Sequence, residues 1–237
     1  MADAPEKPAP SPPVFDDSIT PLIWLLSVGT RLFMRGFTSV GIEGAIDEIP
    51  REGPVIIAAN HASNLDPVVL GSWAIPKIGR RFQWLGKKEL FDWPIIGYIA
   101  RHGGVHPVDR STADVEAYRL AKRILDEGHV LFVFPEGTRS PDGTLQEARD
   151  GVAALALRTG APIVPVAISG SDRVWPRGQK LPRPGGRITV RVGSPFRLAD
   201  VLPPDVDRRD EKTAATTIIM GRIAALLPDR QRGVYRV

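Results

Sequence analysis

Short apolar runs alternate with helix-like stretches along most of this chain. Residues 55–59, 130–134 and 163–168 are apolar and contain no charged residue, as expected of strands that are buried on both faces. Between them, residues 111–127 show helical periodicity and precede a glycine stop. Strands and helices that alternate in this way pack as an α/β domain. The sequence therefore predicts a single α/β domain with a central, mostly mixed β-sheet flanked by helices.

Shorter patterns supply the remaining elements. Further strands are expected over 81–85 and 187–192, and further helices over 151–158 and 213–227. A chain of 237 residues with 43% hydrophobic and 24% charged residues is long enough for one such domain and is not globally disordered. The chain has no Cys, which excludes disulfides, thiolate metal sites and a cysteine nucleophile.

The first 40 residues divide into two segments of different composition. Residues 1–21 hold six prolines and four acidic residues against one Lys, so they are predicted to form a disordered tail.

Residues 22–40 are mostly apolar. Their polar side chains recur at helical spacing: Ser27, Arg31, Arg35 and Thr38. The charge-free run here is 13 residues, short of the roughly 20 that span a bilayer. We therefore expect 22–40 to form an amphipathic helix that lies in the membrane surface. The alternative is that this helix packs on the domain formed by residues 41–237.

A candidate general base follows the first buried strand. His61 stands at the C-terminal end of residues 55–59, where α/β sheets bind ligands. Asp66 precedes Pro67 and is the expected N-cap of a helix. If the loop folds back, the Asp66 carboxylate reaches one imidazole nitrogen of His61 and leaves the other basic. That pairing deprotonates hydroxyl groups.

Two further clusters contain arginines suited to phosphate. Residues 134–139 read Phe-Pro-Glu-Gly-Thr-Arg and follow a buried strand. Arg139 can hold a phosphate bidentately, and Glu136 can fix its direction or accept a hydrogen bond from a substrate. A solvated ion pair in a surface turn is the alternative. Arg110 lies just ahead of a predicted helix N-terminus, which also favours a phosphate.

Common cofactor and metal motifs are absent. No two glycines are separated by a single residue, which excludes the dinucleotide fingerprint, and the sequence has no P-loop, G-x-S-x-G or H-E-x-x-H motif. His102 and His106 stand four apart, but the two glycines between them disfavour the helix that would place both on one face. No metal site is therefore expected.

Four blocks, in this order and spacing, resemble the glycerolipid acyltransferases of the lysophosphatidate acyltransferase type. The four blocks are His61 with Asp66, Gly104 with Arg110, Phe134 to Arg139, and Val164 with Pro165. Lys87 and Lys88 also resemble the family's lysine pair, which stands ahead of the second block. The resemblance covers roughly residues 40–195 and marks 41–237 as the acyltransferase domain. Two departures are His106, where the family has an aromatic or aliphatic residue, and Ala148-Arg149, where it often has Phe-Lys.

The resemblance implies a reaction and a set of site residues. The chain would transfer a fatty acyl group from acyl-CoA or acyl carrier protein to the free hydroxyl of a lysophospholipid. The expected acceptor is 1-acylglycerol-3-phosphate, and another lyso-lipid or a glycolipid is the alternative. The thioester is a co-substrate, so no cofactor is expected. His61 and Asp66 would be catalytic, and the substrate-binding residues would be Asn60, Ser63, Lys87, Arg110, Glu136, Gly137, Thr138 and Arg139.

The charge balance favours an anionic partner, since 31 Lys and Arg face 27 Asp and Glu. Residues 77–88 and 173–199 contain basic but no acidic side chains, which suits an anionic lipid surface, the phosphates of coenzyme A or an acidic carrier protein. The alternative for residues 173–199 is that their basic side chains only keep the protein soluble. Nucleic acid is not expected, because no aromatic stacking pattern accompanies these charges. With no export signal and no Cys, we expect a peripheral or monotopic membrane protein on the cytoplasmic face.

Two other classes of function stay open from the sequence. One is a lipid-surface binding protein without turnover, although a pure binder does not require a base and its orienting acid. The other is a serine hydrolase that uses Ser63, although Ser63 stands only two residues from His61 and no nucleophile elbow exists.

Overall fold

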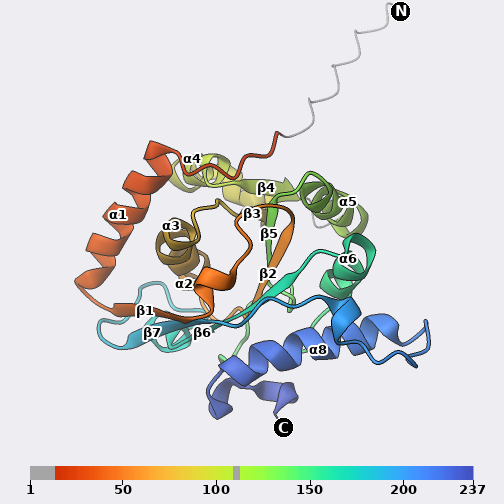
Figure 1. Ribbon diagram of the computed structural model, residues 1–237. Helices are drawn as coiled ribbons and strands as arrows, with labels where there is room; N and C mark the ends of the chain where they lie inside the picture. The colour runs from red at the N-terminus through yellow and green to blue at the C-terminus, as the bar shows by residue number, and fades with distance from the viewer. Residues whose placement is uncertain (1–13, 109–112, 237) are drawn as a thin grey trace, which may run out of the picture.

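The computed structural model describes residues 14–108 and 113–236, which form one domain with helices on both sides of a seven-stranded sheet (Figure 1). The strands are β1 (Ser39–Gly44), β2 (Val55–Ala59), β3 (Gln83–Lys87), β4 (Val105–Val108), β5 (Val130–Val133), β6 (Ile163–Ser169) and β7 (Arg187–Val192). The α-helices are α1 (Pro21–Arg35), α2 (Leu65–Val69), α3 (Ile75–Ile78), α4 (Pro94–His102), α5 (Ala113–Asp126), α6 (Gly151–Thr159), α7 (Ser171–Val174) and α8 (Glu211–Leu226). Short 3₁₀ or π segments are η1 (Ile46–Glu48), η2 (Leu70–Ala74), η3 (Lys88–Asp92), η4 (Leu198–Asp200), η5 (Asp229–Gln231) and η6 (Gly233–Tyr235). The predicted fold class is confirmed.

The sheet has the order β1-β7-β6-β2-β5-β3-β4 and is parallel except where β6 meets β7. The strands β2 to β6 therefore all end at one edge of the sheet, called the carboxyl edge below. Because β1 is parallel to β7, it runs against β2 and begins at this same edge. Every residue of β2 is buried, as expected of a central strand covered on both faces.

Two layers of helices bury the two faces of the sheet. Successive strand residues face opposite sides, so Ile56 packs in the core under α5, α6 and α8, whereas Ile57 packs in the core with α2 and α3. The crossovers from β2 to β3 and from β3 to β4 advance in the same direction across the sheet. Right-handed crossovers therefore place α4 on the same side as α3, and Figure 1 shows α1 on that side as well.

The predicted element types are confirmed, with shifts at their ends. The strands β2 and β7 match their predicted bounds, and β5, β6 and α6 differ by one residue at one end. The strand predicted over 81–85 begins two residues later, because the backbone N–H of Arg81 donates to the carbonyl of Asp17 instead of pairing with a strand.

The helix α1 ends earlier than the predicted 22–40. It begins after Thr20, whose side chain accepts the backbone N–H of Ile23 at 3.3 Å, and has Pro21 in its first turn. It stops at Arg35, so the predicted helix is wrong over its last five residues. A tertiary contact ends the helix early, because β1 (Ser39–Gly44) pairs with β7 along its whole length.

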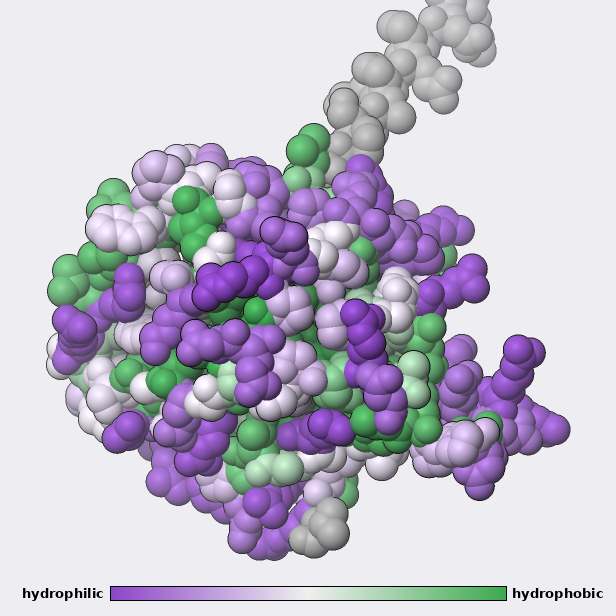
Figure 2. Space-filling model, viewed as in Figure 1, coloured by the Kyte–Doolittle hydropathy of each residue, from purple (hydrophilic) through white to green (hydrophobic). Residues whose placement is uncertain are grey.

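The outer face of α1 is apolar and its inner face holds a serine. The exposed large side chains are Trp24, Leu25, Leu32 and Phe33, and Figure 2 shows apolar side chains along this side of the molecule. Ser27, predicted on a polar stripe, is instead buried near Gly71, and its hydroxyl donates to the carbonyl of Ile23 at 2.8 Å. Ile23 and Met34 are buried beside Ser27, so α1 is apolar on its outer face as well as on its inner face, unlike a helix that faces water. Within the described residues, no helix combines the length and hydrophobicity needed to cross a membrane.

Residues 14–20 pack against the domain, so the predicted disorder of 1–21 is wrong there. Phe15 is 7% exposed, and its ring contacts those of His106 and His129 edge-on, with centroids 5.2 and 5.6 Å apart. One buried aromatic side chain thus anchors a segment whose composition is that of a disordered chain.

Asp17 fixes the same segment through an ion pair. Its carboxylate accepts hydrogen bonds from Nε and Nη2 of Arg80 at 3.1 and 2.6 Å, and Arg80 also donates to three backbone carbonyls. Arg81 pairs with Asp16. These two arginines of the basic stretch 77–88 are therefore bonded to other residues of the domain, which does not support their predicted contribution to a lipid-binding surface.

We expect Phe15→Ala to lower the free energy of unfolding by about 3 kcal/mol, because it leaves a cavity at the edge of the core. Val14 is 89% exposed, so Val14→Ala is the matched control and should change the stability by less than about 0.5 kcal/mol. Urea unfolding followed by tryptophan fluorescence measures both. Equal stabilities of the two variants would contradict the docking of this segment.

Candidate active site

Three loops meet at the carboxyl edge of the sheet around His61. The backbone N–H of His61 donates to Glu136 Oε1 at 2.6 Å, and the carbonyl of His61 accepts the N–H of Ser140 at 2.7 Å. These bonds join the loop after β2 to the loop after β5. The hydroxyl of Ser63 donates to the carbonyl of Trp175 at 2.8 Å and joins the segment after β6. His61 is therefore held by backbone bonds on both sides.

Asp66 holds the imidazole of His61. Its Oδ2 lies 2.9 Å from His61 Nδ1 and accepts the backbone N–H groups of Ala62 and Ser63 at 2.7 Å each. The Asp66 side chain is 0% exposed, whereas that of His61 is 16% exposed. The predicted fold-back of the loop is confirmed. A neutral imidazole whose Nδ1–H donates to Asp66 has Nε2 as its proton acceptor.

The predicted N-cap role of Asp66 is wrong. The helix α2 begins at Leu65 with Asn64 at its N-cap, so Asp66 already lies in the first turn. From there its carboxylate turns back to the loop of residues 61–63, where three donors converge on a single oxygen.

Phe134 fixes the plane of the His61 ring. The two rings stack with their centroids 3.9 Å apart and an interplanar angle of 11°. Sequence reasoning missed this role. The available signal was that Phe134 is the last apolar residue before a polar loop, at the end of a strand adjacent to β2.

Glu136 joins two loops. It is 4% exposed, and its Oε2 accepts the backbone N–H of Gln146 at 2.9 Å while Oε1 accepts that of His61. Burial raises the pKa of Glu136 to about 7, although the two N–H donors act in the opposite direction. The predictions that Glu136 orients Arg139 or binds substrate are not supported, because each carboxylate oxygen is already engaged with the backbone.

The titration of Glu136 links stability to pH near neutrality. Because its folded pKa lies above the ordinary glutamate value of 4.5, the folded state holds the proton more tightly than the unfolded state. The resulting stability is complete below the unfolded pKa and is lost as the pH rises through about 7. We expect the wild-type protein to lose on the order of 1 kcal/mol per pH unit over this window, relative to Glu136→Gln.

Urea unfolding at the two ends of that window measures the difference. Glu52→Gln, at an exposed site, is the matched control and should keep the pH dependence of the wild-type protein. If the stabilities of the wild-type protein and Glu136→Gln change in parallel with pH, the raised pKa of Glu136 is contradicted.

Asn60 and Ser63 bind the backbone, so their predicted contact with substrate is not supported. The Asn60 side chain donates to the carbonyl of Ile168 at 3.0 Å and accepts the Ile168 N–H at 2.7 Å, which fixes the end of β2 against β6. Ser63 is fully buried and donates to Trp175 instead of His61. This geometry also argues against Ser63 as a hydrolase nucleophile.

Gly137 and Thr138 are exposed in the loop after β5. Gly137 has φ +66°, and a Cβ there would come 3.4 Å from Nε of Arg149. The side chain of Arg149 therefore lies over Gly137, which brings a cation to this loop. The basic residue that replaces the family's lysine thus lies beside the predicted substrate loop.

Two of the predicted substrate-binding residues, Arg139 and Lys87, lie at the carboxyl edge. Arg139 is half-buried, and its carbonyl accepts a hydrogen bond from Nη1 of Arg177 at 2.7 Å. Lys87 is exposed at the end of β3. Arg110 lies outside the described residues.

His102 and His106 bond to different partners. His102 Nδ1 lies 2.9 Å from the carbonyl of Tyr98, and His106 Nε2 lies 2.8 Å from Gln83 Oε1. Burial, followed by the nearby charge of Arg81, lowers the pKa of His106 to about 4, so this residue is a neutral packing group. Among the described residues, no three His, Asp or Glu side chains are grouped to hold a metal ion.

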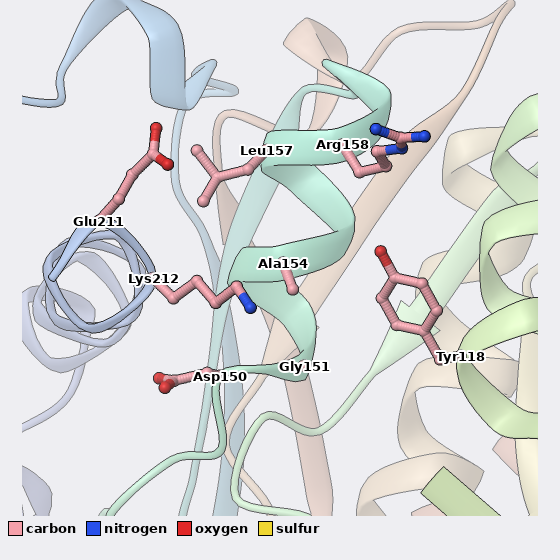
Figure 3. A pocket seen from close by; sticks show the side chains of 8 residues that line it. All are labelled: Tyr118, Asp150, Gly151, Ala154, Leu157, Arg158, Glu211 and Lys212. Carbon is pink, nitrogen blue, oxygen red and sulfur yellow. The ribbon is translucent and has the colours of Figure 1, made fainter. Parts of the chain in front are cut away.

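A surface hollow of about 560 Å³ lies elsewhere, between α5, α6 and α8 (Figure 3). Figure 3 shows Lys212 extending from α8 towards α6. The lining includes none of the predicted site residues that the structure describes. This hollow is therefore separate from the candidate active site.

Comparison with known proteins supports one family. The acyltransferase family model matches residues 42–169, which is 128 of the 237 residues. The chain is 32% identical over 170 residues to a chloroplastic 1-acyl-sn-glycerol-3-phosphate acyltransferase of Arabidopsis thaliana, covering 70% of this chain and 46% of that protein. It is 34% identical over 148 residues to a 1-acyl-sn-glycerol-3-phosphate acyltransferase of Cocos nucifera, covering 61% of this chain and 46% of that protein. The chain thus spans about half the length of these curated relatives.

A solved structure shares the fold. The crystal structure of the 1-acyl-sn-glycerophosphate (LPA) acyltransferase PlsC from Thermotoga maritima matches with a TM-score of 0.68 and 24% identity, over 86% of this chain and 79% of that one. The His61–Asp66 pair lies inside the span that matches the family model. The chain belongs to the acyltransferase family.

Proposed function

We propose that this chain is an O-acyltransferase that moves a fatty acyl group from a thioester to the free hydroxyl of 1-acylglycerol-3-phosphate, giving phosphatidic acid. The observation that carries this proposal is the 2.9 Å contact between His61 Nδ1 and the buried carboxylate of Asp66. The names of the two relatives support the choice of acceptor. The donor is acyl-CoA or acyl-loaded acyl carrier protein.

The proposed reaction needs no covalent enzyme intermediate. The acceptor hydroxyl gives its proton to His61 Nε2 while its oxygen attacks the thioester carbonyl carbon. The tetrahedral intermediate collapses, the carbon–sulfur bond breaks, and the leaving thiolate takes the proton back from the imidazolium. Asp66 keeps the tautomer and stabilises the imidazolium. General-base assistance of this kind contributes about 10²- to 10⁴-fold.

Cations at the carboxyl edge position the acceptor in this proposal. Arg139, Arg149 and Lys87 all belong to segments at this edge, and an arginine matches the geometry of a phosphate. Arg110 completes the proposed set. Glu136 supports the site indirectly in this proposal, because its carboxylate accepts the backbone N–H of His61.

Peripheral membrane association through α1 is part of the proposal. Its large exposed side chains are apolar, and Arg35 is exposed at its last turn. A helix with this pattern binds the boundary between headgroups and acyl chains. Three residues separate the C-terminal end of α1 from β1, which starts at the carboxyl edge.

The test is a thiol-release assay with purified protein, vesicles, long-chain acyl-CoA and 1-acylglycerol-3-phosphate. We expect acceptor-dependent thiol release with formation of the diacyl product. Release of free fatty acid without diacyl lipid would indicate a hydrolase. If neither acyl-CoA nor acyl-loaded carrier protein reacts with this acceptor, but another lysophospholipid or a glycolipid accepts the chain, the reaction class stands and the acceptor changes.

A further inference from the structure

The segment that follows β3 exposes an unusual number of large apolar side chains. Six of the 15 exposed large apolar residues in the described chain fall within residues 90–99. They are Leu90, Trp93, Ile95, Ile96, Tyr98 and Ile99, together called the α4 face below. Exposed apolar groups of this size, gathered on one short segment, mark an interaction site.

The inner side of α4 is built from small residues. Gly97 and Ala100 are its buried positions, and a Cβ at Gly97 would come 2.5 Å from the carbonyl oxygen of Phe91. The helix therefore lies tightly on η3 through its small residues and turns its large ones outward. A helix that faced water would have the opposite distribution.

The α4 face lies near the candidate active site. The strand β3 ends at the carboxyl edge, so η3 and the start of α4 leave from the edge at which His61 lies. The exposed side of α1 also reaches this edge at its C-terminal end. Both helices cover the same side of the sheet (Figure 1).

The chemistry of the α4 face suits a lipid surface better than a protein. Trp93 and Tyr98 are the aromatic types that settle at membrane interfaces. Exposed basic side chains bracket the face, with Lys87 before it and Arg101 after it. The charges over residues 87–102 are Lys87, Lys88 and Arg101 against Glu89 and Asp92. Lysine is depleted from protein interfaces, whereas it is attracted to anionic headgroups.

We propose that the α4 face is a second membrane-contact surface, which inserts into an anionic bilayer alongside α1. This inference rests on the proposed function, because it concerns how that same site meets its lipid acceptor. Two contacts, one through α1 and one through the α4 face, fix the tilt of the domain, which one helix does not. The carboxyl edge then faces the headgroups, and a lysophospholipid presents its hydroxyl to His61 while its acyl chain stays in the membrane.

The experiment compares two matched charge substitutions at exposed apolar sites. Ile95 is 76% exposed on the α4 face, and Val115 is 58% exposed on α5, which covers the other side of the sheet. Full-length Ile95→Glu and Val115→Glu are mixed with vesicles of phosphatidylcholine and phosphatidylglycerol in equal parts, without substrate. Sedimentation gives the bound fraction, and circular dichroism checks the fold. Ile95→Leu is the conservative partner.

We expect Ile95→Glu to bind these vesicles about tenfold or more weakly than the wild-type protein, since one large side chain leaves the apolar phase. Val115→Glu and Ile95→Leu should bind like the wild-type protein. Unchanged binding of Ile95→Glu, equal losses in both Glu variants, or no binding by the wild-type protein would each overturn the proposal. So would a lipid-free wild-type dimer that Ile95→Glu converts to monomers, because the face would then pair two copies.

This test is independent of turnover. If the thiol-release assay finds no acyltransfer while Ile95→Glu loses vesicle binding, the proposed function fails and the membrane contact stands. If acyltransfer is found and Ile95→Glu binds normally, the proposed function stands and the membrane contact through the α4 face fails.

Discussion

His61→Ala is expected to lower kcat/KM for acyl transfer by about 10²- to 10⁴-fold. The imidazole is the proposed proton acceptor, and its ring is held by Asp66 on one side and by the stacked ring of Phe134 on another. Thiol release with saturating acyl-CoA and varied 1-acylglycerol-3-phosphate measures the loss. The backbone bonds of residue 61 to Glu136 and Ser140 do not require the imidazole, so the fold should persist.

The matched control is His102→Ala. His102 is exposed and its Nδ1 lies against the carbonyl of Tyr98, so its loss should leave kcat/KM within about twofold, as expected of a surface substitution. Near-full turnover by His61→Ala would refute the general-base mechanism. A comparable loss in both variants would show that the assay reports a general effect of removing histidine.

The sheet was predictable because burial imposes a strong pattern on central strands. The bounds of β2 match its apolar run, since a strand covered on both faces has no room for polar side chains. The strand β1 is not among the predicted strands, and its first two residues fall within the predicted helix 22–40. Its sequence, Ser-Val-Gly-Ile-Glu-Gly, is half polar or glycine, and it becomes a strand only because β7 is there to pair with.

The candidate site was predictable where contacts are local. His61 and Asp66 are five residues apart, so a single loop brings them together. Glu136 bonds to the backbone N–H of a residue 75 positions away, and no sequence pattern shows which backbone groups a buried carboxylate will meet. For the same reason the sequence predicts Asn60 and Ser63 as substrate ligands, whereas in the fold Asn60 bonds the end of β2 to β6 and Ser63 bonds the loop after β2 to the segment after β6.

Asp66→Asn is the second large effect, and we expect it to lower kcat by about 10³-fold or more. An asparagine has only one oxygen to place among the three donors that now converge on Oδ2. If its oxygen takes that place, the negative charge that stabilises the imidazolium is lost, and the amide nitrogen occupies the buried Oδ1 position, for which the described residues offer no hydrogen-bond partner. If its nitrogen faces His61, Nδ1 must become an acceptor and Nε2 carries the proton, which removes the base.

The split between kcat and KM separates this orienting role from substrate binding. Asp66 is fully buried behind His61, so KM for the acceptor should stay within a few-fold while kcat falls, because an interaction needed only in the transition state is lost. Asp126→Asn on α5, which removes a surface carboxylate paired with Lys122, should alter neither constant. A rise in KM with kcat unchanged in Asp66→Asn would place the carboxylate at the substrate and contradict its role in orienting the base. The geometry favours the first outcome, because all three hydrogen bonds to Oδ2 come from the loop that carries His61.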